Sequence, residues 1–116
     1  MADIRDLQKK VIAFRDERNW QQFHSDYKDL ALSLSLEAAE VLEHFQWRNK
    51  EEFKEYLKTH KEDVADELAD VLYWVLLMSN DLGIDMSSAL ESKLIKTAKK
   101  YPVKKSKNSK KKYTEL

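Results

Sequence analysis

The chain has 116 residues, of which 36% are charged, and it contains one glycine, one proline and no cysteine. So few turn-forming residues exclude a multi-stranded sheet and favour an all-α protein of one domain. The lack of cysteine excludes disulfides and thiolate metal sites. No apolar leader follows Met1, and the longest apolar-rich run, Val71 to Met78, is too short to cross a bilayer. We therefore expect a cytoplasmic protein.

The formal net charge of zero conceals an uneven distribution of charge. Residues 1–98 carry 20 acidic and 13 basic side chains, whereas residues 99–112 carry eight lysines and no acid. We expect a helical domain over residues 1–103 and a Lys-rich tail over residues 104–116. The tail could be solvated, or could fold back onto a polyphosphate or onto the acidic body. Nucleic-acid binding is disfavoured, because the acidic body would repel a phosphate backbone.

The first half of the chain predicts two helices, from the spacing of apolar residues and from capping signals. The first helix spans residues 3–18. Residues 19–29 lack a clean period and are rich in aromatic side chains, so we expect a structured loop. Asp29 is expected to cap the second helix, which spans residues 30–45.

The second half predicts a short amphipathic helix at residues 51–57 and two further main helices. One spans residues 61–81 and is apolar on most of its sides beyond Val71. Such a helix must be covered by more than one neighbour, which predicts an oligomer. Gly83 signals its end, and the last helix begins at residue 85 or 87 and ends at Tyr101-Pro102.

Two acidic pairs of the same shape stand inside the apolar second and third main helices. They are Glu37-Ala38-Ala39-Glu40 and Glu67-Leu68-Ala69-Asp70. A spacing of three places both carboxylates of a pair on one helical face. Converging carboxylates without matching cations would repel one another, and a hard divalent cation resolves that repulsion. Mg²⁺ takes carboxylate oxygens together with substrate phosphates, so the pairs predict a Mg²⁺ site for phosphate-ester or phosphoanhydride chemistry.

Ordinary surface charge and a di-iron centre are the main alternatives to a magnesium site. Surface charge is disfavoured, because the leucines around both acidic pairs indicate burial. A di-iron bundle requires Glu-x-x-His, and none of His24, His44 or His60 has a Glu three residues before it. A zincin spacing, a Gly-rich phosphate loop and a covalent nucleophile are also missing. Water activated by the metal is then the expected nucleophile.

Three tryptophans indicate the kind of ligand. Trp20 lies in the aromatic loop, Trp47 just after the second helix, and Trp74 one turn beyond Asp70 on the same face. Each alone could belong to a core. Beside a metal site suited to phosphates, however, they could clamp a base by stacking, which points to a nucleotide.

Five segments together carry a family resemblance: Phe14 to His24, Glu37-x-x-Glu40, Phe45-Gln46-Trp47, Asp66 to Leu72, and the stretch from Lys99-Lys100-Tyr101-Pro102 to Leu116. They resemble the MazG-like nucleotide pyrophosphohydrolases, and within them the dCTP pyrophosphatase subgroup. The resemblance implies an all-α, four-helix bundle that assembles as a tetramer, a dimer of dimers. It also implies cleavage of a nucleoside triphosphate between its α- and β-phosphates.

Roles for individual residues follow from the same resemblance. The implied Mg²⁺ ligands are Glu37, Glu40, Glu67 and Asp70, with Glu37 or Glu40 as the catalytic base. The implied substrate-binding residues are Trp20, His24 and Trp47 near the base and sugar, Lys93 at the phosphates, and Trp74 and Thr97, which replace a Tyr and an Asn. Val11 replaces a His near the base in the mammalian dCTP enzymes, so we expect a less strict choice of base.

The expected function is therefore Mg²⁺-dependent hydrolysis of dNTPs, dCTP among them, to dNMP and pyrophosphate, as house-cleaning of the nucleotide pool. Residues 1–103 would form the catalytic domain, with no membrane partner and no stable nucleic-acid partner. The alternative is a non-catalytic helical module. Such a module would oligomerise through the third main helix and bind an acidic partner through its Lys-rich tail.

Overall fold

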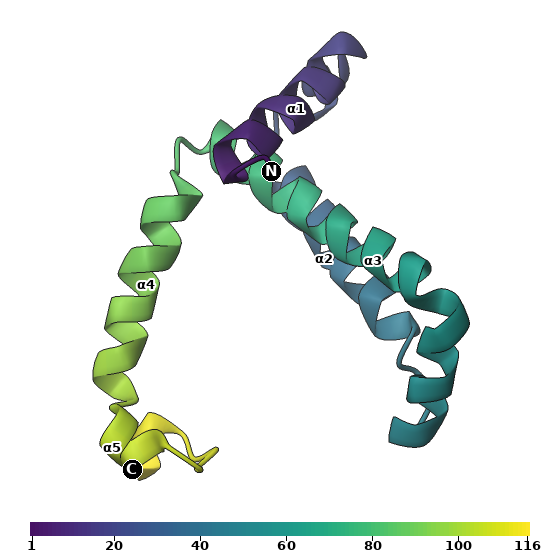
Figure 1. Ribbon diagram of the computed structural model, residues 1–116. Coiled ribbons are helices and arrows are strands. Elements are labelled where there is room, and N and C mark those ends of the chain that lie inside the picture. Colours follow the sequence, from purple (N-terminus) through teal and green to yellow (C-terminus); the bar gives the residue numbers. More distant parts are fainter. The chain divides into compact units, whose positions relative to one another are not determined.

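The computed structural model describes residues 1–116, and all of its regular structure is helical (Figure 1). The prediction of an all-α protein is confirmed. The chain divides into two units, residues 1–83 and residues 84–116, which are described separately. None of the helices combines the length and the apolarity needed to cross a bilayer. The elements are α1 (Ile4–Glu17), the 3₁₀ turn η1 (Trp20–Phe23), α2 (Tyr27–Glu43), α3 (Lys50–Asp81), α4 (Met86–Lys100), α5 (Val103–Ser106) and the 3₁₀ turn η2 (Tyr113–Glu115).

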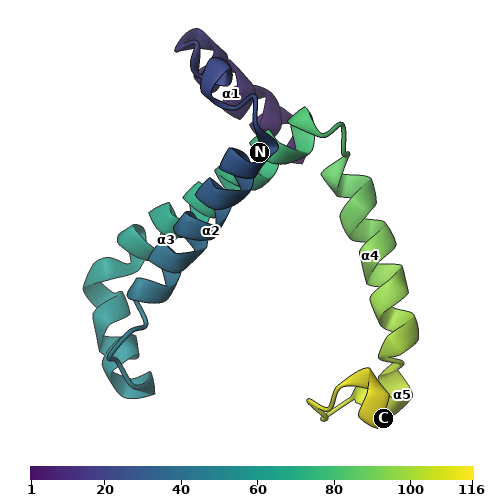
Figure 2. The same ribbon diagram turned by 180° about the vertical axis from the view of Figure 1, so that it is seen from behind.

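The first unit is built on a hairpin of α2 and α3, which lie side by side and run antiparallel (Figures 1 and 2). α2 begins earlier than predicted, because Asp26 caps it by accepting a hydrogen bond from the Lys28 N–H at 2.9 Å. The predicted cap, Asp29, is wrong. That residue lies in the first turn of α2, where its negative charge still complements the helix dipole.

α3 joins two segments that the sequence predicts as separate helices. Asn49 caps it through a capping box with Glu52. The predicted break survives only as a kink at His60, whose φ of −123° and ψ of 15° are not helical. There the Tyr56 carbonyl lies 3.1 Å from His60 Nδ1 and 3.4 Å from the Thr59 hydroxyl. α3 therefore runs past the acidic pair as one long helix with a single bend.

α1 is fixed to the C-terminal half of α3 by polar contacts. The Gln8 amide donates to the Leu76 carbonyl at 3.0 Å and to the Ser79 hydroxyl at 3.1 Å. Arg15, which is buried, donates two hydrogen bonds to Asp81 at 2.7 and 3.2 Å. Removing Asp81 would take two hydrogen bonds from a buried guanidinium that keeps only Asp16 as an acidic partner, so the Arg15–Asp81 pair holds the end of α3 against α1.

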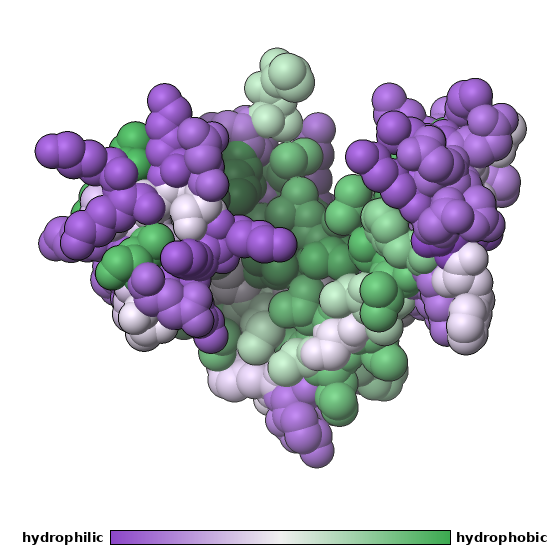
Figure 3. Space-filling model, turned by 90° about the horizontal axis from the view of Figure 1, so that it is seen from below, coloured by the Kyte–Doolittle hydropathy of each residue, from purple (hydrophilic) through white to green (hydrophobic).

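Few apolar side chains are fully buried. The buried ones are Leu30, Val64, Leu76 and Leu77. By contrast, Leu36 on α2 is 66% exposed and Leu68 on α3 is 54% exposed. Figure 3 shows apolar side chains open to solvent over a broad area. Large exposed apolar areas of this kind mark surfaces that bind another molecule.

The second unit consists of α4 and a C-terminal segment that folds back onto the C-terminal end of α4. Asp85 caps α4 by accepting from the N–H groups of Ser87 and Ser88. The helix stops at Tyr101, immediately before Pro102, as predicted. Beyond α5 the Tyr113 ring packs edge-on against Tyr101, with the centroids 5.9 Å apart. The Lys-rich segment between these two tyrosines is thus drawn into a closed loop.

Candidate active site

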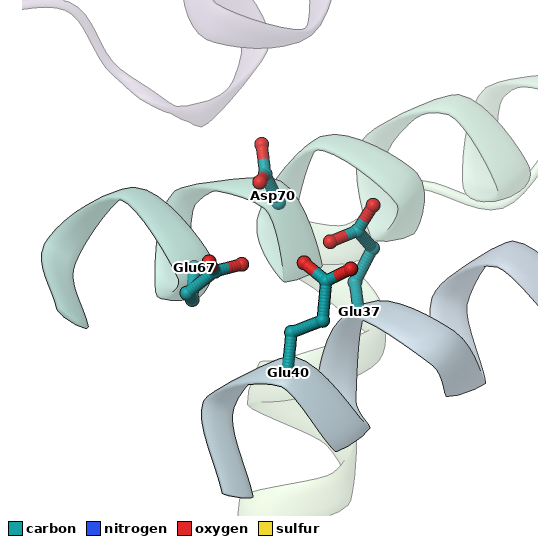
Figure 4. A group of neighbouring side chains, drawn as sticks. All are labelled: Glu37, Glu40, Glu67 and Asp70. Carbon is teal, nitrogen blue, oxygen red and sulfur yellow. The ribbon is translucent and has the colours of Figure 1, made fainter. Parts of the chain in front are cut away.

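Four carboxylates from two helices converge at one point in the first unit (Figure 4). Glu37 and Glu40 come from α2, and Glu67 and Asp70 come from α3. Each offers one oxygen, and these four oxygens all lie within 4.8 Å of one another. The spacing of three and the antiparallel hairpin together produce this arrangement, because each pair occupies the face that its partner helix contacts.

The electrostatics of the cluster favour a cation. A hydrogen bond with Glu40, together with burial and the neighbouring charges, raises the pKa of Glu67 to about 7. Burial, followed by Glu40 and Asp70, raises the pKa of Glu37 as well. No lysine or arginine forms an ion pair with any of the four carboxylates. Their one basic neighbour is His44, which lies 4.0 Å from Glu67.

Two carboxylate oxygens of the cluster lack hydrogen-bond partners. Glu37 Oε2 and Glu67 Oε2 are buried and receive no hydrogen bond. A buried acceptor without a donor is costly, and a cation bound among the four oxygens would relieve that cost. An all-oxygen set of carboxylates is the donor chemistry that Mg²⁺, Ca²⁺ and Mn²⁺ prefer. The residues present therefore fit a hard divalent cation.

An open pocket of about 500 Å³ adjoins the cluster. Glu37 and Asp70 belong both to the cluster and to the lining of this pocket. The rest of the lining is mostly aromatic or apolar: Lys10, Val11, Phe14, Trp20, Tyr73 and Trp74. A flat, apolar group bound in the pocket would thus lie next to whatever the carboxylates hold.

Edge-to-face ring contacts build the aromatic wall of the pocket. Phe14 meets Trp20 and Tyr73 at centroid distances of 5.9 and 6.2 Å, and Tyr73 meets Trp74 at 5.3 Å. His24 is not part of the lining but contacts Trp74, with 5.4 Å between the ring centroids. Burial, and next the charge of Arg15, lowers the pKa of the His24 ring that contacts Trp74.

The remaining predicted substrate residues do not line this pocket. Trp47 has a φ of 68° and is 89% exposed, and it does not line the pocket. It lies in the turn after α2, four residues beyond Glu43, the last residue of that helix. Lys93 and Thr97 lie one turn apart on α4, in the second unit. The structure thus brings Trp20 and Trp74 into one pocket with Glu37 and Asp70, and Trp47 is not part of that pocket's lining.

Sequence reasoning overlooked four residues at this site. Lys10, Phe14 and Tyr73 line the pocket, and His44 lies beside Glu67, with 4.0 Å between Nε2 and Oε1. Helical spacing could have identified two of them, because Tyr73 follows Asp70 by three residues and His44 follows Glu40 by four. Nothing in the sequence indicates the position of Lys10, which depends on how α1 packs.

Comparison with known proteins identifies the family. The fold and site define a helical protein that presents four carboxylates beside an aromatic pocket. Residues 32–116 match the model of the MazG-like family, and the chain belongs to that family. It is 34% identical over 115 residues to dCTP pyrophosphatase 1 of Mus musculus and 32% identical to that of Homo sapiens, covering 97% of this chain and 67% of each relative.

A solved structure agrees with this assignment. A pyrophosphatase from Archaeoglobus fulgidus is 38% identical to the chain, with a TM-score of 0.79 over 88% of this chain and 94% of that one. The predicted family is therefore confirmed, and so is the prediction of an enzyme of the pyrophosphatase class. The alternative of a non-catalytic helical module loses its support.

Proposed function

We propose that this chain hydrolyses deoxynucleoside triphosphates, dCTP among them, to the monophosphate and pyrophosphate in a Mg²⁺-dependent reaction. The observation that carries the proposal is the convergence of Glu37, Glu40, Glu67 and Asp70 at the edge of an aromatic pocket. Relatives named dCTP pyrophosphatase 1 support the choice of substrate. The reaction would clear unwanted nucleotides from the cytoplasmic pool, with residues 1–103 as the catalytic domain and residues 104–116 as an accessory tail.

The four carboxylates would hold the metal, since they form the all-oxygen set described above. Mg²⁺ bound there would neutralise charge on the triphosphate and make water a better nucleophile. Glu37 or Glu40 would accept the proton of the attacking water as the general base. Glu67 and Asp70, on the facing helix, would hold the metal together with Glu37 and Glu40, and the metal would supply the charge that binds the triphosphate.

The aromatic wall would bind the base. Trp20 and Trp74 offer faces for stacking, and His24 supports Trp74 from behind. Stacking tolerates different bases, whereas hydrogen bonds to base edges discriminate among them. Val11 contributes only apolar surface to this wall. We therefore propose a deoxynucleotide enzyme that is less strict about the base than its mammalian relatives.

The site would be completed by three residues that do not line the pocket: Trp47, Lys93 and Thr97. Exposed leucines on α2 and α3 favour assembly of several copies, and we propose a tetramer. Trp47, exposed beyond the end of α2, would then reach a nucleotide held by another copy. Lys93, with Thr97 one turn away, would stabilise charge on the departing pyrophosphate.

A substrate panel tests the proposal. The four dNTPs and the four NTPs are incubated with the protein with and without Mg²⁺, and pyrophosphate and orthophosphate are measured separately. We expect Mg²⁺-dependent pyrophosphate from dCTP and from at least one other dNTP. Use of dCTP alone would refute the tolerant pocket, and orthophosphate as the product would refute the reaction.

A further inference from the structure

A polar relay adjoins the carboxylate cluster, and it uses residues that do not line the aromatic pocket. His44 follows α2, and its Nε2 lies 4.0 Å from Glu67 Oε1. Its other ring nitrogen, Nδ1, is 2.6 Å from the Tyr56 hydroxyl. The His44 side chain is only 15% exposed. A largely buried imidazole thus connects a tyrosine near the start of α3 with a carboxylate further along the same helix.

The Tyr56 hydroxyl is held in place by groups on both faces of its ring. The His60 ring stacks on it with 4.0 Å between centroids and 3° between planes, and the Arg48 guanidinium lies 3.8 Å from the same centroid. Two groups this close to one ring cannot share a face, so they clamp it from opposite sides. Arg48 also donates to the His44 carbonyl at 2.8 Å, which ties the clamp to His44 itself.

The neighbouring carboxylate selects the arrangement of hydrogens in this relay. When Glu67 is ionised, as a metal ligand must be, a hydrogen on His44 Nδ1 would leave the lone pair of Nε2 facing a negative carboxylate, which is unfavourable. If the Tyr56 hydroxyl donates to Nδ1, Nε2 carries the hydrogen and directs it at Glu67. The second arrangement needs no protonation of the ring. It gives Glu67 a donor on one side while its other oxygen, Oε2, stays without a partner.

We propose that His44, oriented by Tyr56, is a positioning residue that turns Glu67 toward the metal. This inference rests on the metal-dependent function proposed above. The 4.0 Å separation is longer than a hydrogen bond. This gap between His44 and Glu67 would close when a bound cation draws the carboxylates together. Glu67 Oε2 would then remain available to the metal. Donors that orient a carboxylate ligand in this way are typically worth about 10- to 100-fold in metal affinity.

Direct metal titration tests the inference without relying on activity. Binding of Mg²⁺ is measured by calorimetry, and binding of Mn²⁺ by electron paramagnetic resonance, on the full chain without nucleotide. In His44→Asn the amide nitrogen stands near the position of Nδ1, so the donor toward Glu67 is lost. In His44→Gln the amide can replace Nε2. We expect a dissociation constant raised about 10-fold or more in His44→Asn and largely restored in His44→Gln.

Tyr56→Phe removes only the hydroxyl, so it tests the relay even where a His44 variant fails to fold. It should raise the dissociation constant in the same direction as His44→Asn. Phe53→Leu is the matched control, because the Phe53 ring lies 6.0 Å from that of Tyr56 but is not part of the relay. It can lower the melting temperature but should leave metal binding unchanged.

The outcomes separate the two proposals. A wild-type chain that binds neither metal overturns the proposed metal-dependent function, and the inference with it. A wild-type chain that binds metal, with His44→Asn and Tyr56→Phe binding equally well, overturns only the inference. Equal weakening in His44→Gln and His44→Asn would also contradict it, because a purely steric role would not distinguish the position of the donor.

Discussion

Glu37 and Asp70, from antiparallel helices, each belong at once to the carboxylate cluster and to the wall of the aromatic pocket. A ligand that touches both residues therefore has one part among hard oxygen donors and another against aromatic rings. A nucleoside triphosphate with its metal has these two parts in this order. If the substrate is a nucleoside triphosphate, as we propose, the shared pair would allow the hairpin of α2 and α3, together with α1, to bind both its phosphate half and its base half.

Removing one carboxylate should abolish activity without harming the fold. We expect Asp70→Asn or Glu40→Gln to lower kcat by on the order of 100-fold or more, as when one preorganised charge-stabilising group is lost. Without metal, the melting temperature should stay the same or rise, because repulsion within the cluster falls. Pyrophosphate release and thermal melting in EDTA measure the two effects. Near-normal turnover in either variant would exclude these residues as metal ligands.

The raised pKa of Glu67 predicts how the metal-free protein responds to pH. In the unfolded chain this carboxyl titrates near 4.5, and in the folded chain at about 7. Between those values the folded state binds more protons, so its stability falls as pH rises. The contribution is fully present below about pH 4.5 and is lost as pH passes 7. Melting curves in EDTA from about pH 5 to 8 should show this slope, and Glu67→Gln should flatten it.

Loss of a stacking ring should weaken substrate binding and spare the metal. Trp20→Ala should raise KM about 5- to 150-fold, since stacking on one base is worth about 1–3 kcal/mol. Metal affinity measured by calorimetry should not change, because Trp20 is not among the carboxylates. Phe23→Ala is a suitable control, as that ring lies in the same turn, is 66% exposed and does not line the pocket. An unchanged KM in Trp20→Ala would place the base elsewhere.

Substitution of Trp47 tests whether one active site uses residues from two copies of the chain. Trp47→Ala should raise KM strongly, although this side chain lies outside the pocket of its own protomer. When Trp47→Ala and Glu40→Gln chains are co-expressed, mixed oligomers would contain sites with intact carboxylates from one chain and an intact Trp47 from another. Activity should therefore exceed the sum of the two separate variants. Activity no greater than that sum would mean that Trp47 does not act across an interface.

The exposed leucines predict an obligate oligomer. Sedimentation at low micromolar concentration should show no folded monomer, because Leu32, Leu36 and Leu68 are each more than half exposed in the single chain. Leu32→Lys should weaken assembly, whereas Ser35→Lys, at an exposed polar position on the same helix, should have a smaller effect. A stable wild-type monomer would contradict both the tetramer and the sharing of sites.

The structural features that are best predicted from the sequence are those that local geometry determines. The spacing of Glu37 and Glu40 defines their helical face whatever the neighbours do, and Gly83, with φ of 71°, ends α3 as its conformational freedom suggests. The start of α2 is harder to predict, because Asp26 and Asp29 are both good caps three residues apart. The contact of His44 with Glu67 depends on the register between two helices, and no local pattern reports that register.

The product of the reaction tests the central claim most directly. dCTP labelled at the α-phosphate is incubated with the wild-type chain and with Asp70→Asn, with Mg²⁺ or EDTA, and the products are separated. The carboxylate cluster predicts labelled dCMP and one pyrophosphate for each dCTP consumed, from the wild-type chain with Mg²⁺ only. Labelled dCDP with orthophosphate, or equal turnover in EDTA, would contradict this account of the site.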